Sequence, residues 1–249
     1  MKTLKVLSAL LDYPTKELQE ASSELKAVLR SEALLGRSDL EALCALIDDI
    51  ASRDILDVQE RYVLLFDRTR SLSLHLFEHV HGESRDRGQA MVDLLQVYEK
   101  AGWQATASEL PDYLPMFLEY ASTRPPVEAM ELVGQPGHVL AALRERLARR
   151  QSPYESVFAA LVSLADAKLD AAELNALRAE PDPEPDDLKA LDELWQEEEV
   201  TFGPGAASDC GVDSLAAKIR QAARPAPGLD PPRRGGPATI ITASSAERS

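Results

Sequence analysis

The run DVQERYVLLFDRTRSLSLHLFEHVHGESRDRGQAMVDLLQVYEKAGWQATASELPDYLPMFLEYAS, residues 57–122, indicates the fold of this chain most clearly. Apolar side chains recur in it at helical spacing, and a stripe of this kind covers one side of a helix. The first stripe is Val58, Tyr62, Leu65 and Phe66, and a later one is Met91, Leu94, Leu95 and Tyr98. The run therefore predicts consecutive amphipathic helices.

The same periodicity extends on both sides of this run. Before it, we predict a helix on Leu4, Leu7 and Leu11, a helix capped by Thr15 that continues to Leu29, and a helix from Asp39 to Ala51. Within it, we predict a helix from Thr69 to His81, one capped by Ser84, and one with Pro111 in its first turn that ends near Ser122. After it, helices restart at Pro125, end before the Gly134–Gly137 break, continue to about Arg150, and run from Ser152 to Leu169. No sustained alternation of period two appears before residue 180, so the expected fold is all-α, a single domain of about eight to nine helices.

The character of the chain changes after residue 179. Residues 1–179 form the predicted helical domain, and residues 180–202 form an acidic linker, with nine acidic residues from Pro181 to Phe202 against the single Lys189. A short helix is expected in this linker from Asp186 to about Val200. Residues 203–249 are rich in Gly, Pro, Ser and Ala and poor in large apolar residues, so we expect a largely disordered tail.

Composition narrows the classes of partner and compartment. The formal net charge is −15, which repels phosphate backbones and anionic lipids, so neither nucleic acid nor a membrane surface is an expected partner. Two cysteines cannot build a disulfide framework or a thiolate zinc site. No segment approaches the ~20 apolar residues of a membrane span, and Asp12 interrupts the N-terminal apolar run. The expected location is the cytoplasm.

One short motif raises the possibility of metal chemistry. His75-Leu-Phe-Glu78-His79 matches the H-x-x-E-H pattern of one group of zinc hydrolases, in which two histidines one helical turn apart bind zinc and the glutamate is the general base. On a helical wheel, however, His75 and Glu78 point toward solvent, His79 lies at the border and His81 points elsewhere. Solvated or edge histidines are therefore favoured, and a helical zinc hydrolase is the alternative.

Charged residues crowd the chain directly after these histidines. Arg85 and Arg87 lie at a predicted helix start, where the helix dipole disfavours cations. A mixed-charge corner beside the apolar Phe66 would suit a groove that holds an amphipathic partner helix, although the charges could also simply pair with each other. Further along, Asp112 and Tyr113 fall in a predicted first helical turn, where the positive helix end explains an acidic residue. No Gly-x-Ser-x-Gly segment or glycine-rich phosphate loop is present.

Four stretches together resemble the NarJ family of nitrate reductase assembly chaperones, within the wider TorD/DmsD group of redox enzyme maturation proteins. They are Leu10–Pro14 (LLDYP), Gln59–Arg68 (QERYVLLFDR), Leu74–Met91 (LHLFEHVHGESRDRGQAM) and Glu109–Pro115 (ELPDYLP). The resemblance covers roughly residues 1–175. Its most specific part is His79–Arg87, HVHGESRDR.

The resemblance implies an all-helical, non-enzymatic chaperone without a cofactor or metal of its own. Such proteins bind the N-terminal segment of the molybdenum-containing catalytic subunit of nitrate reductase and hold the apoenzyme open for cofactor insertion. In the wider group a Pro-Asp-His-Leu segment helps to form the peptide site. Here Tyr113 replaces the His, which leaves Asp112 as the matching candidate. The expected peptide-binding residues are Phe66, His75, Glu78, His79, His81, Arg85, Arg87, Asp112 and Tyr113. A third possibility is a scaffold that binds through the acidic segment Glu180–Glu199.

Overall fold

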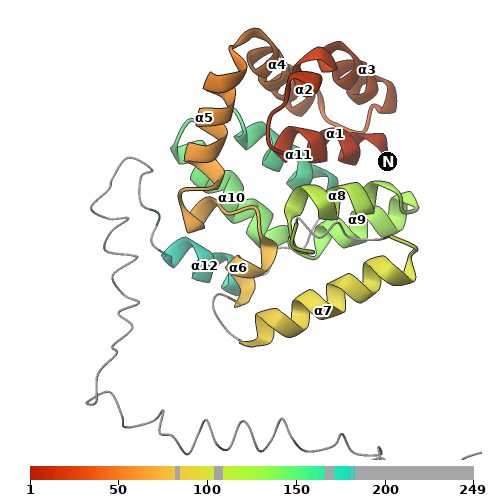
Figure 1. Cartoon of the computed structure of the whole chain (residues 1–249), viewed down its shortest axis with the longest axis vertical. Helices are drawn as coiled ribbons and strands as arrows, with labels where there is room; N and C mark the ends of the chain where they lie inside the picture. The colour runs from red at the N-terminus through yellow and green to blue at the C-terminus, as the bar shows by residue number, and fades with distance from the viewer. Residues whose placement is uncertain (82–84, 104–108, 166–170, 181, 183–249) are drawn as a thin grey trace, which may run out of the picture. The chain divides into compact units, whose positions relative to one another are not determined.

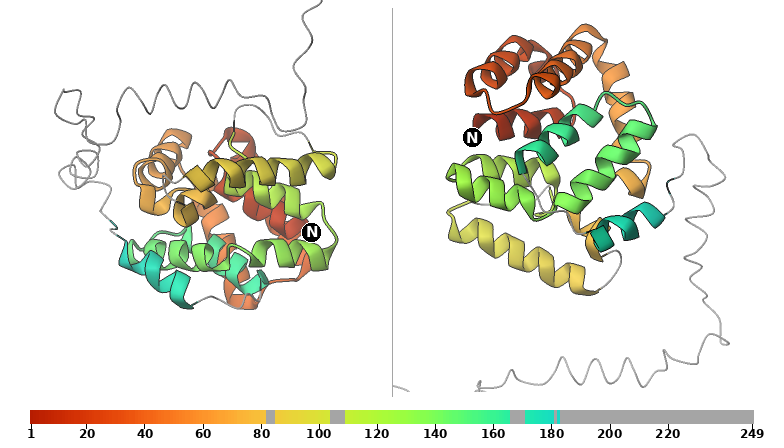
Figure 2. Two further views of the ribbon diagram at one scale, coloured as in Figure 1. Left: turned by 90° about the horizontal axis from the view of Figure 1, so that it is seen from below. Right: turned by 180° about the vertical axis from the view of Figure 1, so that it is seen from behind.

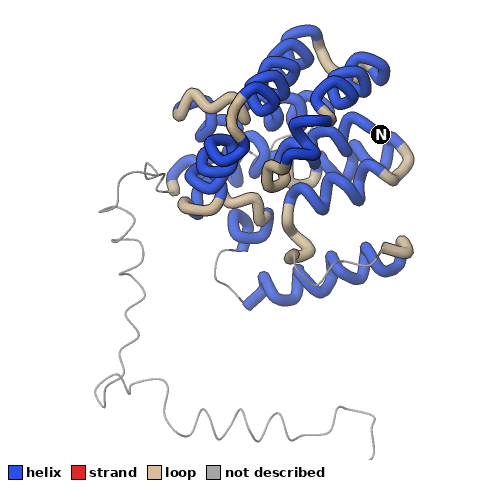
Figure 3. Tube along the Cα trace, turned by 45° about the horizontal axis from the view of Figure 1, so that its top comes forward, coloured by secondary structure: helices blue, strands red, loops and turns tan. Residues whose placement is uncertain are grey.

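Helices account for all the regular secondary structure in the part of the chain that the computed structural model describes, residues 1–81, 85–103, 109–165, 171–180 and 182 (Figure 3). All of these residues belong to one unit of the chain, Met1–Trp195. The elements are α1 (Lys2–Leu11), α2 (Lys16–Glu20), α3 (Ser22–Glu32), α4 (Arg37–Ser52), α5 (Ile55–Phe66), the 3₁₀ helix η1 (Arg70–Leu72), α6 (Leu76–His81), α7 (Arg85–Lys100), α8 (Leu114–Ser122), α9 (Pro126–Gly134), α10 (Gly137–Arg149), α11 (Glu155–Ala165) and α12 (Ala171–Ala179). The predicted all-α class is confirmed.

Local sequence signals explain several of the helix boundaries. The Thr15 side chain accepts a hydrogen bond from the Leu18 N–H at 3.3 Å and begins α2, as predicted. Asp54 accepts from the Leu56 N–H at 2.8 Å and begins α5. The break at Gly134–Gly137 separates α9 from α10 where it was expected. The described helices outnumber the eight or nine predicted, in part because the helix expected from Thr15 to Leu29 is divided at Ala21 into α2 and α3.

The helix predicted from Thr69 to His81 is wrong. The chain forms only the short η1 there, is non-helical at residues 73–75, and enters α6 at Leu76. The backbone of residues 74–76 pairs with that of residues 112–114: the Leu114 N–H donates to the Leu74 carbonyl at 2.8 Å, and the Leu76 N–H donates to the Asp112 carbonyl at 3.1 Å. These long-range hydrogen bonds replace the local ones that a continuous helix would have made.

The predicted position of Pro111 in the first turn of a helix is also wrong. α8 begins at Leu114, and Pro115 occupies its first turn. Pro111, Asp112 and Tyr113 precede the helix, because the backbone of residues 112–114 is engaged with residues 74–76. The positive end of α8 therefore does not explain Asp112.

The core forms where the most apolar helices meet. α1 packs against α8 and α3, α10 packs against α11 and α12, and α11 also contacts α4 and α9 (Figures 1 and 2). Side chains with no exposed surface come from elements throughout the described chain: Leu7, Leu11, Leu43, Val58, Leu72, Leu114, Leu118, Val139, Leu140, Val157, Phe158 and Leu161. Burial on this scale is the main driving force for the fold.

Several predictions fall on residues that lie outside the described part. They are the short helix from Asp186 to Val200, the remainder of the acidic linker apart from Glu180 and Asp182, and the tail at residues 203–249. Among the described helices, none combines the length and the apolar character needed to cross a membrane.

Candidate functional site

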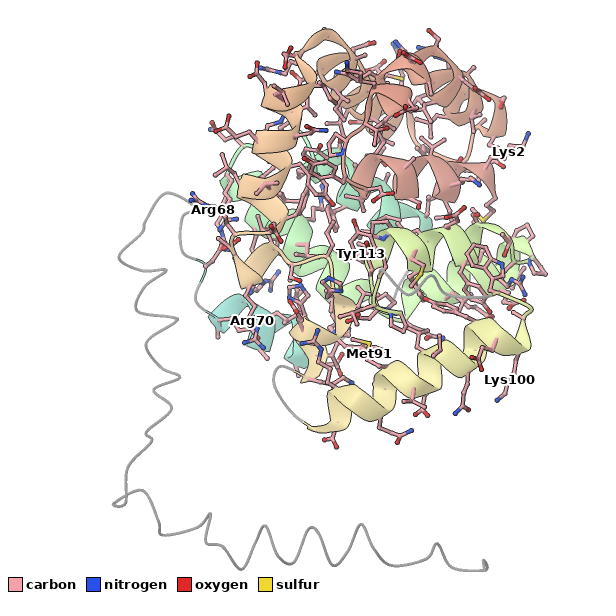
Figure 4. The ribbon with its side chains drawn as sticks, in the orientation of Figure 1. Lys2, Arg68, Arg70, Met91, Lys100 and Tyr113 are labelled. Carbon is pink, nitrogen blue, oxygen red and sulfur yellow. The ribbon has the colours of Figure 1, made fainter. Side chains whose placement is uncertain are left out.

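Two of the sequence motifs meet at an antiparallel bridge between His75 and Tyr113. His75 is the last residue of the non-helical segment 73–75, and Tyr113 is the residue directly before α8. Their rings lie 5.5 Å apart, tilted by 37°. Figure 4 labels Tyr113 at the start of α8. We call His75, Glu78, Arg87, Asp112 and Tyr113 the polar corner.

Asp112 is the buried centre of the polar corner, with no exposed surface. One carboxylate oxygen accepts the backbone N–H of Phe77 at 3.0 Å, and the other lies 3.3 Å from His75 Nδ1. Phe77 is in the first turn of α6, where backbone N–H groups have no partner within the helix. Asp112 therefore caps α6, a helix distant in sequence, and its burial is offset by these two donors.

The environment of His75 favours the protonated form of its imidazole. Its hydrogen bond with Asp112 raises the pKa of the imidazole, and this effect outweighs partial burial, which lowers it. The side chain retains 28% of its surface exposed. A charge on His75 would therefore face the Asp112 carboxylate on one side and solvent on the other.

The pKa of the His79 imidazole is shifted in the opposite direction from that of His75. Burial lowers the pKa of its imidazole, although a hydrogen bond to the Ser73 carbonyl opposes the effect. Nε2 lies 2.8 Å from that carbonyl oxygen, so the neutral ring donates from Nε2. The His79 imidazole thus connects α6 to the non-helical segment 73–75 that precedes it.

Tyrosine hydroxyls link the polar corner to two further motifs. The Tyr62 hydroxyl on α5 donates to the Leu11 carbonyl at 2.8 Å and lies 3.1 Å from the Tyr113 hydroxyl. The Tyr113 hydroxyl is also 3.3 Å from an Asp12 carboxylate oxygen. Burial raises the pKa of both phenols, so both remain neutral donors at physiological pH. Asp12, like the neighbouring Tyr13, is exposed.

An ion pair connects the polar corner to α7. Arg87 Nη2 lies 3.1 Å from Glu78 Oε1, and each side chain is about one-fifth exposed. Arg85 begins α7, but its side chain lies outside the described residues. His81 is at the end of α6, with its ring 5.5 Å from that of Phe77.

Phe66 lies inside the helical core. It is only 7% exposed, and its ring packs 5.0 Å from that of Tyr62 and 5.2 Å from that of Tyr154. It connects to the polar corner through Tyr62, whose hydroxyl lies 3.1 Å from that of Tyr113.

The geometry expected for zinc binding is wrong. His75 is the residue directly before α6, and the two imidazoles have different partners: Nδ1 of His75 lies 3.3 Å from an Asp112 carboxylate oxygen, and Nε2 of His79 lies 2.8 Å from the Ser73 carbonyl oxygen. Across the residues whose positions are described, no three His, Cys, Asp or Glu side chains gather in a way that could hold a metal ion.

Two neighbours of the polar corner, Asp12 and Tyr13, were absent from the predicted site. Tyr13 is 46% exposed, and its ring meets that of Tyr62 edge-on at 5.7 Å. Gln59 on α5 reinforces the junction by donating to the Pro14 carbonyl at 2.8 Å. The sequence signal for these two residues is the LLDYP stretch, one of the four stretches on which the family resemblance rests.

The part of the chain that the structure describes is all-helical, and four separate sequence motifs converge in it on one cluster of polar side chains. The model of the nitrate reductase delta subunit family matches residues 15–160, and the chain belongs to this family. Nitrate reductase molybdenum cofactor assembly chaperone NarJ of Escherichia coli K12 is 41% identical over 221 residues, which cover 89% of this chain and 92% of the relative.

Further relatives bear similar names. The probable nitrate reductase molybdenum cofactor assembly chaperone NarW of Escherichia coli K12 is 40% identical over 86% of this chain and 90% of its own. The probable nitrate reductase molybdenum cofactor assembly chaperone NarJ of Bacillus subtilis 168 is 32% identical, over 68% of this chain and 88% of the relative. The resemblance inferred from the four stretches is thereby confirmed at the level of the family.

Proposed function

We propose that this chain is an assembly chaperone that binds the N-terminal segment of the apo catalytic subunit of a respiratory nitrate reductase and assists molybdenum cofactor insertion. The function is binding, without a catalytic step. Its support is the similarity to proteins named as nitrate reductase molybdenum cofactor assembly chaperones, which extends over most of both chains. We further propose that binding takes place in the cytoplasm.

The observation that supports a recognition site most directly is the convergence of the four motifs. Asp12, Tyr62, His75 and Tyr113 come from different elements yet contact one another directly or through a single hydroxyl. Beside them, Tyr13 offers an exposed aromatic ring, and Asp12 offers an exposed carboxylate. This mixture suits a segment with one apolar side and a few cations.

Net charge supports a basic-leaning partner. At −15, the chain attracts cationic segments over distances comparable to the Debye length, which accelerates association more than it strengthens the final complex. We assign the specificity of binding to contacts at the polar corner.

Isothermal titration tests the proposal directly. The full chain is titrated with a synthetic N-terminal peptide of a nitrate reductase catalytic subunit and, separately, with a scrambled peptide of the same composition. We expect saturable binding of the native peptide alone. Equal binding of both peptides would mean that the interaction depends on net charge and not on the sequence of the peptide. Binding of neither peptide would contradict recognition of this segment.

A pair of variants locates the binding surface. Tyr13→Ala removes an exposed ring beside the polar corner, whereas Val127→Ala removes an exposed side chain, 71% accessible, at the start of α9. We expect Tyr13→Ala to weaken peptide binding roughly ten-fold, as loss of an aromatic contact does, and Val127→Ala to have no effect. Unchanged affinity in Tyr13→Ala would place the peptide elsewhere.

A further inference from the structure

Three arginines gather on one side of the last turns of α10. Arg146, Arg149 and Arg150 are spaced i, i+3 and i+4, which places them together on a helix surface. The side chain of Arg146 is 2% exposed and that of Arg150 5% exposed. Buried guanidinium groups of like charge repel each other and require nearby anions or carbonyl dipoles.

The anions come from the beginning of the acidic segment. Asp182 accepts hydrogen bonds from Arg149 Nη2 at 2.7 Å and from Arg150 Nη2 at 2.7 Å. Glu180 Oε2 lies 3.2 Å from Arg146 Nη2. Burial raises the pKa of Asp182, but bonds from Ser71 and the arginines outweigh it, so the pKa lies below its usual value and the carboxylate is charged.

The same contacts reach the 3₁₀ turn that precedes the polar corner. The Ser71 hydroxyl on η1 donates to Asp182 Oδ1 at 2.8 Å, and the Ser71 carbonyl accepts from Arg146 Nη1 at 2.7 Å. Two residues later, the Ser73 carbonyl holds His79. Both the hydroxyl and the carbonyl of Ser71 are thus hydrogen-bonded, and Ser71 lies a few residues before His75 in the chain.

We propose that Ser71, Arg149 and Arg150 form a carboxylate-binding site, which Asp182 of the same chain occupies. We call Asp182 with these contacts the strap, and we propose that it holds residues 70–76 in the conformation that forms the polar corner. Arg146 and Glu180 form its second attachment. Glu180 and Asp182, at the beginning of the acidic segment, therefore stabilise the fold of their own chain. This role does not depend on binding a partner.

Hydrogen exchange in the full chain tests the strap. In Asp182→Ala, the amides of Leu72, Ser73 and Leu76, which donate to backbone carbonyls within or beside this segment, should exchange at least ~10-fold faster. Asp48→Ala, which breaks an ion pair with Lys26 on another part of the fold, is the matched control and should leave these amides unchanged. Equal exchange in the two variants would overturn the proposal.

A second comparison separates the direct contact from a change in net charge. Ser71→Ala removes one donor to Asp182 and no charge, and it should accelerate exchange at the same amides. If the two residues act through one contact, the double variant Ser71→Ala/Asp182→Ala should not exceed Asp182→Ala. Strictly additive effects would show that Ser71 and Asp182 act separately and would also overturn the proposal.

Discussion

At the scale of single residues, Asp112 does most to define the polar corner. It is completely buried, yet it contacts a backbone N–H of α6 and an imidazole, so one carboxylate positions both a helix and a titrating group. A carboxylate in this setting is stabilising only while both donors stay in place.

Asp112→Asn retains the size of the side chain and an oxygen acceptor but removes the charge. We expect the free energy of unfolding to fall by about 2 kcal/mol and the pKa of His75 to fall toward its ordinary value, since its main cause is lost. Urea unfolding and an NMR titration of His75 measure the two effects. Asp48→Asn is the control, and an unaltered His75 pKa in Asp112→Asn would contradict this account.

The two histidines should give opposite dependences of stability on pH. The folded-state pKa of His75 is raised, so its stabilisation is complete below about pH 6.5 and is lost as pH rises through the folded pKa. The folded-state pKa of His79 is lowered, so its stabilisation is present above about pH 6.5 and is lost as pH falls through the folded pKa.

Urea unfolding between pH 5.5 and 8 distinguishes these contributions. His75→Gln should flatten the dependence above about pH 6.5, whereas His79→Gln should flatten it below that value. If either variant changed the slope on the other side of pH 6.5, the assigned direction of its pKa would be wrong.

At the scale of elements, α7 is attached at few points. Among its side chains that the structure describes, only Tyr98 is buried. The Tyr98 hydroxyl donates to the Pro111 carbonyl at 2.8 Å, and its ring lies 4.7 Å from that of Tyr120. Near the other end of α7, Arg87 pairs with Glu78.

Tyr98→Ala should therefore release α7 before the rest of the fold. We expect amide exchange along α7 to accelerate ~10-fold or more, because a buried ring and a hydrogen bond are lost, while the amides of α3 and α4 keep their rates. Val97→Ala, at a position 41% exposed on the same helix, controls for helix propensity. Equal acceleration in α3 and α4 would mean that α7 unfolds only with the whole domain.

At the scale of the whole molecule, Arg146 joins elements that the chain separates widely. From α10, it donates to the Ser71 carbonyl of η1 and to the Leu177 carbonyl of α12. Removing it would leave two buried carbonyl groups without their charged donor.

Arg146→Met should lower the free energy of unfolding by about 3 kcal/mol, because the apolar replacement fills the space but donates no hydrogen bond. Arg144→Met provides the control on the same helix, since Arg144 is 47% exposed and pairs with Glu155 at the surface. Comparable stability of the two variants in urea would show that Arg146 is not required for cooperative folding.

The sequence by itself determined the helical class, the cap at Thr15, the break at Gly134–Gly137 and the family, because these depend on periodicity, capping and motifs within a few residues. It also identified Asp112 and His75 as candidates, but not their relation. Their contact spans 37 residues, and it required residues 73–75 to leave the predicted helix and pair with the segment before α8.

Only the tertiary structure decided which helix Asp112 caps, how the two histidines differ, and where the buried Arg146 finds its partners. Arg146 reaches Ser71 across 75 residues, and no local pattern specifies such a distance. The physical reason is the same in each case. Buried polar groups must be satisfied by whatever donors and acceptors the packed helices bring near them, and that choice is made by the whole fold.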